Sequence, residues 1–236
     1  RVLPANCKGT SVMFMPMVQG GHHFAPPATV TFTATSVDAV NRTTYSYSSQ
    51  SFGDADASRV VVVGISHGGT TTEASGVTIG GVSATKAIGV TGGSGGAVSS
   101  IWYAEVPTGT TGTIAATISG GAGQCAISVF AVIGANSTPT DTGSHTGSVM
   151  TANDTINVSD GGVIIGNQNS SPHAAPTRTH GWTNLTERVD AQLEGDRSYS
   201  AASDAFETGE TGRSITCTPS GSLSGDVGFV LVSFGP

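Results

Sequence analysis

Apolar side chains along this chain come in short alternating runs and not in helical stripes. Residues 29–35 read Thr-Val-Thr-Phe-Thr-Ala-Thr, and residues 44–49 read Thr-Tyr-Ser-Tyr-Ser-Ser, so apolar or aromatic residues take every second position over most of each run. Alternation with a period of two is typical of a strand with one buried face. Residues 59–65 are almost continuously apolar and β-branched, which predicts a strand that is covered on both faces.

The same pattern continues to the end of the chain and predicts about fourteen strands separated by turn residues. Gly80-Gly81 stands between two strand-like pieces within residues 77–85, which indicates a two-residue hairpin turn. Further strands are predicted at residues 100–105, 112–119, 125–133, 155–158, 162–168, 185–192, 198–206, 213–218 and 227–234. The sequence shows no apolar stripe with the helical period, so we expect an all-β chain folded as an antiparallel, jelly-roll-like β-sandwich.

Residues 1–27 do not share this pattern. Prolines punctuate the segment, methionines alternate within it and a Gly-Gly-His-His-Phe stretch interrupts any regular element; the residues are Pro4, Pro16, Pro26, Pro27, Met13, Met15, Met17 and Gly20 to Phe24. We interpret residues 1–27 as an irregular N-terminal arm, with an ordinary first strand as the alternative. Residues 28–236 are then the sandwich domain, in which the polar residues 134–153 are either a long crossover between sheets or a linker.

The composition fits a strand-rich protein and excludes some partners. Charged residues make up 11% of the chain, against roughly 25% in an ordinary soluble domain, which leaves few charged faces for amphipathic helices. The net charge is −7. Nucleic-acid binding draws its affinity from Lys and Arg, so we expect no nucleic-acid partner. No apolar stretch approaches the roughly 20 residues that a membrane-spanning helix needs, so we expect no membrane partner.

The chain has three cysteines, Cys7, Cys125 and Cys217. Cys125 and Cys217 share their strand faces with aliphatic residues, which predicts buried, reduced thiols. Cys7 lies in the irregular arm and is the thiol that is free to pair with another chain, as the odd count allows. None of the cysteine spacings matches a zinc site, and we expect no metal and no cofactor.

One motif raises the question of catalysis. Gly64-Ile65-Ser66-His67-Gly68 matches the G-x-S-x-G pattern of a nucleophile elbow directly after an apolar strand. An elbow needs a helix after the serine, because strand, turn and helix together present the hydroxyl above a sheet. Residues 69–76 are instead rich in Gly, Thr and Ser and predict a loop. We therefore predict that Ser66 is not a nucleophile.

Acidic residues gather in the last quarter of the chain, at Glu187, Asp190, Glu194, Asp196, Asp204, Glu207 and Glu210. A solvated strand face is the interpretation that we favour. The alternative is that two of these acids face each other on neighbouring strands, as a glycosidase requires. The calcium-loop pattern does not occur, and the histidines show no metal-ligand spacing beyond His22-His23, whose side chains would point to opposite faces of a strand. We expect no catalytic residue.

Two further features bear on glycans. Six asparagines stand in N-x-[ST] triplets, which a composition rich in Ser and Thr also produces by chance: Asn41, Asn136, Asn153, Asn157, Asn169 and Asn184. In a secreted eukaryotic protein they would be glycan acceptors on surface loops. Four aromatic residues could stack on sugars, although isolated aromatic residues in strands usually belong to the core: Trp102, Trp182, Tyr45 and Tyr103.

Several runs of the chain carry a resemblance to a known group of proteins. The runs are residues 59–64, 77–85, 101–112 and 125–130, with Trp182-Thr-Asn-Leu-Thr-Glu-Arg188 and Glu210-Thr-Gly-Arg-Ser214. They resemble the β-sandwich proteins encoded among the head and tail genes of bacteriophages and prophages. The resemblance covers residues 59–236 and implies a virion structural component. It carries over no catalytic residue.

The sequence therefore predicts a non-enzymatic structural component of a phage virion, such as a capsid decoration, head-fibre or tail/neck accessory protein. We expect it to assemble through the N-terminal arm, with contacts at Cys7, Met13, Met15, Met17 and Phe24. Its expected partners are other copies of itself and other virion proteins, and its expected location is the virion. The alternative is a secreted or surface carbohydrate-binding module whose partners are glycans. A glycan-cleaving enzyme is the third class.

Overall fold

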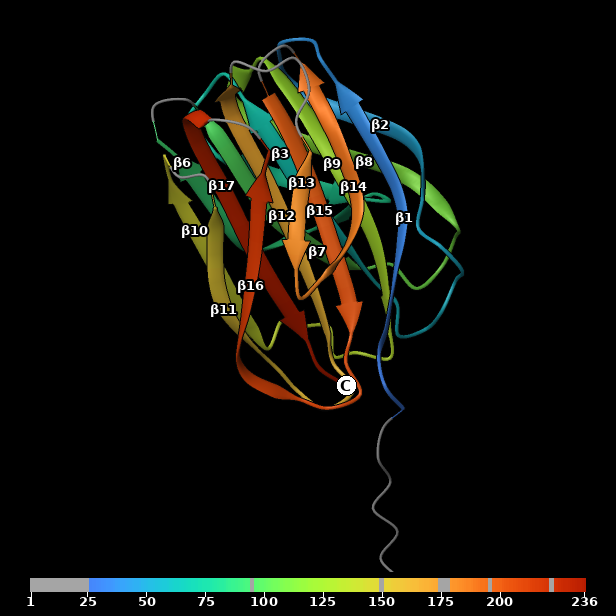
Figure 1. Ribbon diagram of the computed structural model, residues 1–236. Coiled ribbons are helices and arrows are strands. Elements are labelled where there is room, and N and C mark those ends of the chain that lie inside the picture. Colours follow the sequence, from blue (N-terminus) through green and yellow to red (C-terminus); the bar gives the residue numbers. More distant parts are fainter. Residues whose placement is uncertain (1–25, 94–95, 149–150, 174–178, 195–196, 221–222) are drawn as a thin grey trace, which may run out of the picture.

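The computed structural model describes residues 26–93, 96–148, 151–173, 179–194, 197–220 and 223–236 (Figure 1). Every regular element in these residues is a β-strand. Neighbouring strands pair antiparallel, both in the inner and in the outer sheets. The predicted all-β, antiparallel sandwich is therefore confirmed. Its jelly-roll-like connectivity stays a prediction.

Residues 29–133 form the first sandwich, which has two sheets. Its strands are β1 (Thr29–Asp38), β2 (Arg42–Ser51), β3 (Val60–Gly68), β4 (Ala74–Ile79), β5 (Val82–Ser83), β6 (Thr85–Gly92), β7 (Ala97–Glu105), β8 (Thr111–Ala122) and β9 (Gln124–Ile133). Sheet A has the order β1-β9-β3-β7-β6, and sheet B has the order β2-β8-β4-β5. Gly80 and Gly81 between β4 and β5 have φ angles of 60° and 84°, so the predicted two-residue hairpin is confirmed.

Residues 141–234 form the second sandwich. Its strands are β10 (Asp141–Gly147), β11 (Ala152–Val158), β12 (Val163–His173), β13 (His180–Thr183), β14 (Thr186–Glu194), β15 (Arg197–Ala205), β16 (Glu210–Pro219) and β17 (Leu223–Phe234). Sheet C has the order β10-β17-β12-β15-β14, and sheet D has the order β11-β16-β13. Residues 134–140 connect the two sandwiches. Most of the remaining segment that was predicted as a crossover or linker belongs to β10 and the start of β11.

The second sandwich repeats the connectivity of the first. Sheets A and C have the same order, so β1, β9, β3, β7 and β6 correspond to β10, β17, β12, β15 and β14. In sheets B and D, β2, β8 and β4 correspond to β11, β16 and β13, and β5 has no counterpart among the described strands. The chain is a tandem repeat of one topology. The sequence analysis did not detect this repeat.

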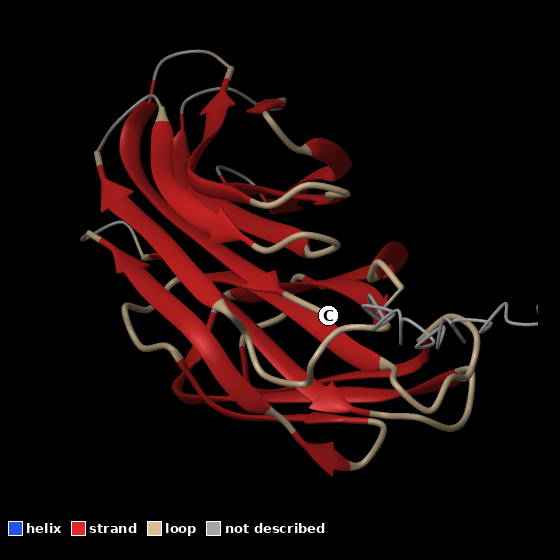
Figure 2. Ribbon diagram, turned by 90° about the horizontal axis from the view of Figure 1, so that it is seen from below, coloured by secondary structure: helices blue, strands red, loops and turns tan. Residues whose placement is uncertain are grey.

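The two sandwiches stack through sheets A and C, which gives four layers in the order B, A, C and D (Figure 2). β6 lies against β10 and β17, and its counterpart β14 lies against β1 and β9. This reciprocal contact relates the sandwiches by an approximate two-fold axis, as in an interface between two identical subunits. An apolar core fills each of the three spaces between the layers.

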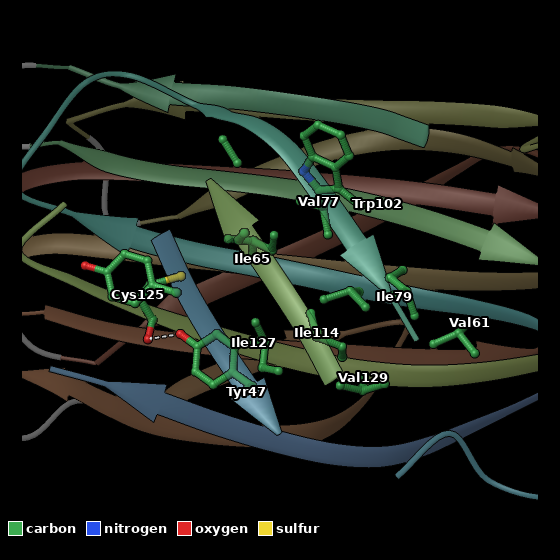
Figure 3. Close-up of a cluster of buried hydrophobic side chains, with 14 of the residues drawn as sticks. Tyr47, Val61, Ile65, Val77, Ile79, Trp102, Ile114, Cys125, Ile127 and Val129 are labelled. Atoms are coloured by element: carbon green, nitrogen blue, oxygen red, sulfur yellow. Dashed lines mark hydrogen bonds between the residues drawn. The ribbon is translucent and has the colours of Figure 1, made fainter. Parts of the chain in front are cut away.

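Strand β3 is buried on both faces because it lies in the inner sheet A. Val60 and Val62 belong to the core between sheets A and C, whereas Val61 and Ile65 belong to the core between sheets A and B. Figure 3 shows the second of these cores, with side chains from both sheets pointing into it. The prediction of a strand with two covered faces is confirmed. A strand in an inner layer has to be apolar on both faces, whereas a strand in an outer layer can alternate apolar and polar residues.

The buried guanidinium of Arg59 fastens the loops at one end of the first sandwich. Arg59 is 1% exposed, and it donates hydrogen bonds of 2.7 to 3.3 Å to six backbone carbonyls. The acceptors are Phe52, Gly53, Asp54, Val106, Thr108 and Gly109. Burial lowers the pKa of Arg59, but the guanidinium stays charged because its ordinary pKa is above 12. One side chain therefore holds the loop before β3 and the loop after β7.

Both described ends of the chain lie at one end of the molecule (Figure 1). The backbone N of Ala28 donates to the Gly161 carbonyl at 2.8 Å. In the connection between the sandwiches, Asn136 donates from its backbone N to Gly235 O at 2.7 Å and from Nδ2 to Pro236 O at 2.8 Å. We call this place, marked by Ala28, Asn136, Gly161 and Pro236, the tether end.

Candidate functional site

Polar side chains form a buried band where sheets A and C meet. Asn167 of β12 donates from Nδ2 to Ser99 Oγ at 2.8 Å. Asn169 donates from Nδ2 to the carbonyl oxygens of His67 and Val98, at 2.7 and 3.0 Å. Both asparagines and Ser99 are fully buried. The band therefore joins the two sandwiches by directional hydrogen bonds, next to the apolar core that they share.

The two inner sheets approach closely at this band because glycines face it. A side chain at Gly64 would meet Asn167 Oδ1 at 2.7 Å, and a side chain at Gly92 would meet the Val227 carbonyl oxygen at 2.6 Å. Within the described residues, Oδ1 of Asn167 and Oδ1 of Asn169 have no hydrogen-bond partner. The amide N–H groups, and not the amide oxygens, therefore hold the band together.

Ser66 lies inside this band and not at a strand-to-helix turn. It belongs to β3, which ends at Gly68, and it is 1% exposed. Its Oγ accepts a hydrogen bond of 3.0 Å from Asn167 Nδ2. The structure describes β4 as the next element, with no helix between Gly68 and Ala74. This position supports the prediction that Ser66 is not a nucleophile, because the hydroxyl has almost no surface open to a substrate.

A second polar cluster lies between sheets C and D. His180 of β13 has its Nδ1 2.7 Å from Asp190 Oδ1, and its backbone N donates to Asp190 Oδ2 at 3.0 Å. On the other side of the ring, Nε2 lies 3.3 Å from Ser170 Oγ of β12. This serine, histidine and aspartate have the connectivity of a hydrolase triad. The sequence analysis named Asp190 in the acidic cluster but did not connect it with Ser170 and His180, because ten-residue intervals between polar residues match no motif.

The serine of this cluster is not placed for catalysis. Ser170 is fully buried, and its hydroxyl lies 2.9 Å from Ser198 Oγ. A nucleophile must reach a substrate carbonyl, with donors about 3 Å from the oxyanion that forms. Instead, the hydrogen bonds from Ser170 through His180 to Asp190 run from sheet C to β13 of sheet D and back to β14. They fasten an outer sheet to an inner one.

Glu187 lies beside this cluster on β14. Burial and the neighbouring Asp190 carboxylate raise the pKa of Glu187, and His180 opposes this rise. Glu187 and Asp190 come from the same strand. They are therefore not the pair on neighbouring strands that the glycosidase alternative requires.

The other acids of the predicted cluster serve separate local contacts. Asp204 accepts from the backbone N of Thr186 at 2.8 Å, and Glu210 forms a 2.6 Å ion pair with Arg213. Glu207 is exposed. Asp196 and the side chain of Glu194 lie outside the described residues. The predicted solvated face is thus correct for part of the cluster, while Asp190 is drawn inward by His180.

His67 is buried at the end of the core between sheets A and B. Neither of its ring nitrogens has a hydrogen-bond partner in the described part of the chain. Burial lowers the pKa of His67 to about 4, so the ring is neutral at pH 7 and packs as an apolar group. Among the described residues, no group of three or more His, Cys, Asp or Glu side chains could hold a metal ion.

The predicted environment of two cysteines is confirmed. Cys125 and Cys217 are buried, free thiols. Burial raises the pKa of Cys125 to about 12 and raises that of Cys217 as well. Tyr47 Oη donates to the Cys125 carbonyl at 2.7 Å (Figure 3). Both thiols are therefore inert in the folded chain.

The features that bear on glycans divide between surface and core. Asn169 is buried in the band, so its N-x-[ST] triplet is not a glycan acceptor in the folded chain; the other five triplet asparagines are exposed. Tyr45 and Trp102 belong to the core between sheets A and B, and Trp182 packs on Phe229 with ring centroids 5.7 Å apart. Tyr103 packs on Phe234 with ring centroids 5.8 Å apart. The core interpretation is confirmed for Tyr45 and Trp102, whereas Trp182 and Tyr103 are half-buried at the edges of the other two cores.

A polar trough opens at the tether end. Its larger part has a volume of about 380 Å³ and is lined by residues that include Val82, Thr85, Tyr103, Glu105, Ser137 and Thr138. A smaller part of about 230 Å³ adjoins it, shares Glu105 and Ser137, and adds Ser58, Val60, Ala135 and Asn136. We call the two parts together the trough. Small hydroxyl groups and aliphatic side chains surround one carboxylate there.

The predicted assembly contacts cannot be compared with this geometry. Cys7, Met13, Met15, Met17 and Phe24 all lie outside the described residues. The same holds for the choice between an arm and a first strand for residues 1–25. In the described part of the chain, no helix is long and apolar enough to cross a membrane.

No family model, curated protein or solved structure matches this chain.

Proposed function

We propose that the protein is a non-catalytic structural component of a phage virion, such as a capsid decoration, head-fibre or tail/neck accessory protein. In this proposal the N-terminal segment holds it in place, and its partners are other copies of itself and other virion proteins. The observation that carries the proposal is the tether end. There Ala28 is hydrogen-bonded to Gly161, and Asn136 of the connection between the sandwiches is hydrogen-bonded to Gly235 and Pro236.

The double sandwich suits such a role. A body that is attached at one end has to hold its far end in a fixed place. The shared core and the hydrogen bonds of Asn167 and Asn169 resist rotation of one sandwich against the other. The polar clusters described above link the sheets of this architecture. Ser66 and Ser170 are both buried within it. The sequence resemblance to phage head and tail proteins supports the same proposal.

Mass spectrometry of purified particles tests the proposal. Particles from the source should be banded in a density gradient and washed in high salt before digestion. We expect peptides of this chain in the particle band, at a copy number comparable with that of other structural proteins. If the chain stays in the soluble fraction while the particles are intact, the proposal is wrong.

A further inference from the structure

We propose that the trough at the tether end receives residues 13–17 from the N-terminal segment of a second copy of this chain. The inference rests on the proposed function and names the surface that this function uses. Three observations on the described residues and the sequence carry it. They are the separation of charge along the chain, the position of Pro27 beside the trough, and the lining of the trough.

Charge is divided unequally between the N-terminal segment and the body. Residues 1–25 contain Arg1 and Lys8 but no acidic residue, so all 16 acidic residues stand in residues 26–236 with the remaining seven of the nine Lys and Arg. A basic segment and an acidic body attract each other, and this attraction also steers their encounter. The body of this chain is therefore a complementary partner for the segment.

Glu105 provides a charge for this contact. It is exposed at the end of β7 and lines both parts of the trough. Its carboxylate makes no hydrogen bond or ion pair within the described part of the chain, whereas its backbone belongs to the β3–β7 pairing. By contrast, several exposed basic groups of the body are already paired, as Lys86 is with Glu73 and Arg42 with Asp38, both at 2.8 Å. Lys8 of an incoming segment would give Glu105 a partner.

The trough also offers apolar surface. Val82 is one of the few large hydrophobic side chains exposed on the body, at 42%, and the half-buried Tyr103 and the buried Ala104 also line the trough. Residues 12–18 read Val-Met-Phe-Met-Pro-Met-Val, an apolar run whose three methionines share one face if it is extended. Methionine side chains adapt to irregular apolar surfaces.

The described chain begins at Pro26 and Pro27, next to the trough. A side chain at Gly134 would lie 3.7 Å from the Pro27 carbonyl oxygen, and Gly134 N donates to Ser58 Oγ in the trough wall at 3.0 Å. Pro27 restricts Pro26 to an extended conformation, which opposes the tight reversal that entry into the adjacent trough requires. A segment from a second copy needs no reversal.

The segment is long enough to reach another copy. Twenty-five residues span about 80 Å when extended, whereas a compact body of this size has a radius of gyration of about 17 Å. In such an exchange, each copy binds one segment in its trough and places its own segment in the trough of another copy. The contact then closes as a dimer or continues along a series of copies.

A disulfide test distinguishes docking of the chain's own segment from docking of a second copy's segment. The full-length chain should carry Met15→Cys and Thr138→Cys in a Cys7→Ser background, since Cys125 and Cys217 are buried. On mild oxidation we expect a covalent dimer on a non-reducing gel. The matched control replaces Thr138→Cys with Ser46→Cys, on the exposed face of sheet B, and should stay monomeric. A monomer with no free engineered thiol would show an intramolecular disulfide, in which each segment fills its own trough, and would overturn the proposal. Dimer formation equal to that of the control would also overturn it.

A charge test completes the experiment. Sedimentation equilibrium of the otherwise unmodified chain should show that Glu105→Gln weakens self-association about twofold to fivefold, the range of an exposed ion pair. Glu207→Gln, at another exposed acid of the tether end, should have no effect. Equal effects of the two variants would overturn the role of Glu105. A neutral oligosaccharide that binds the trough without preventing the cross-link would also overturn it, because the segment would then dock elsewhere. If residues 1–25 are needed on particles but the cross-link fails, the proposed function stands without this docking surface.

Discussion

Asn167 Nδ2 lies 2.8 Å from Ser99 Oγ, and this hydrogen bond crosses from the second sandwich to the first. Both groups are fully buried, so each would lose its partner without gaining water if the sheets slid by one residue. An apolar core alone tolerates small shifts, whereas buried hydrogen bonds are directional. The bond therefore helps to fix how the two repeats stack.

The neighbouring Asn169 should contribute measurably to stability. We expect Asn169→Ala to lower the free energy of unfolding by about 2 kcal/mol, because it removes the N–H donors to the His67 and Val98 carbonyls. Urea denaturation at pH 7 measures the change. Asn153→Ala, at an exposed position, is the control and should change stability by less than about 0.5 kcal/mol. A loss no larger than in the control would show that the band is not a structural link.

The Arg59 side chain should be hard to replace. We expect Arg59→Met to destabilise the chain by about 3 kcal/mol or more, since it leaves buried carbonyls without a charged donor. Arg42→Met, which breaks an ion pair at the surface, should cost at most about 1 kcal/mol. Thermal and urea unfolding of both variants provide the comparison. Similar losses would contradict the role assigned to the buried guanidinium.

Burial of His67 predicts a loss of stability in acid. The pKa of His67 is about 4 in the folded chain, below its ordinary value of 6.5, so between these values the unfolded chain binds the extra proton. Stability then falls as the pH drops from 6.5 to 4, by on the order of 3 kcal/mol for this group. Urea unfolding of the wild type and His67→Leu at pH 7 and pH 4 isolates the effect. An equal acid loss in both proteins would contradict the prediction.

The buried serines should not react with an electrophile aimed at hydrolases. We expect a fluorophosphonate probe to leave Ser66 and Ser170 unlabelled in the folded chain, because both hydroxyls lie inside the sandwiches. Intact-protein mass spectrometry gives the readout, with a heat-denatured sample as the background. Labelling of the native chain that Ser170→Ala abolishes would show that the cluster with His180 and Asp190 is catalytic.

The strands could be predicted from the sequence because their burial follows local pattern. Alternation in residues 29–35 and the continuous run at residues 59–65 match an edge strand and an inner strand of sheet A. The repeat could not be found in this way, since corresponding strands such as β3 and β12 share a topological position and little sequence. Gly64 of β3 faces Asn167 of sheet C, whereas Gly166 of β12 faces Trp182 of sheet D, so the glycines of the two strands do not coincide.

The polar clusters escaped prediction for a related reason. Ser170, His180 and Asp190 meet because β12, β13 and β14 belong to two stacked sheets, and no local spacing encodes this. Ser66 shows the converse, because a local motif was present and the tertiary structure buried it.

Fractionation of particles that carry a truncated chain tests the central claim most directly. Residues 1–25 should be deleted from the gene, and the particles separated from free protein on a density gradient. We predict that the truncated chain keeps the circular dichroism of a β-protein and moves from the particle band to the top of the gradient, while the full-length chain stays with the particles. A folded, truncated chain that still sediments with the particles at full copy number would contradict attachment through the N-terminal segment.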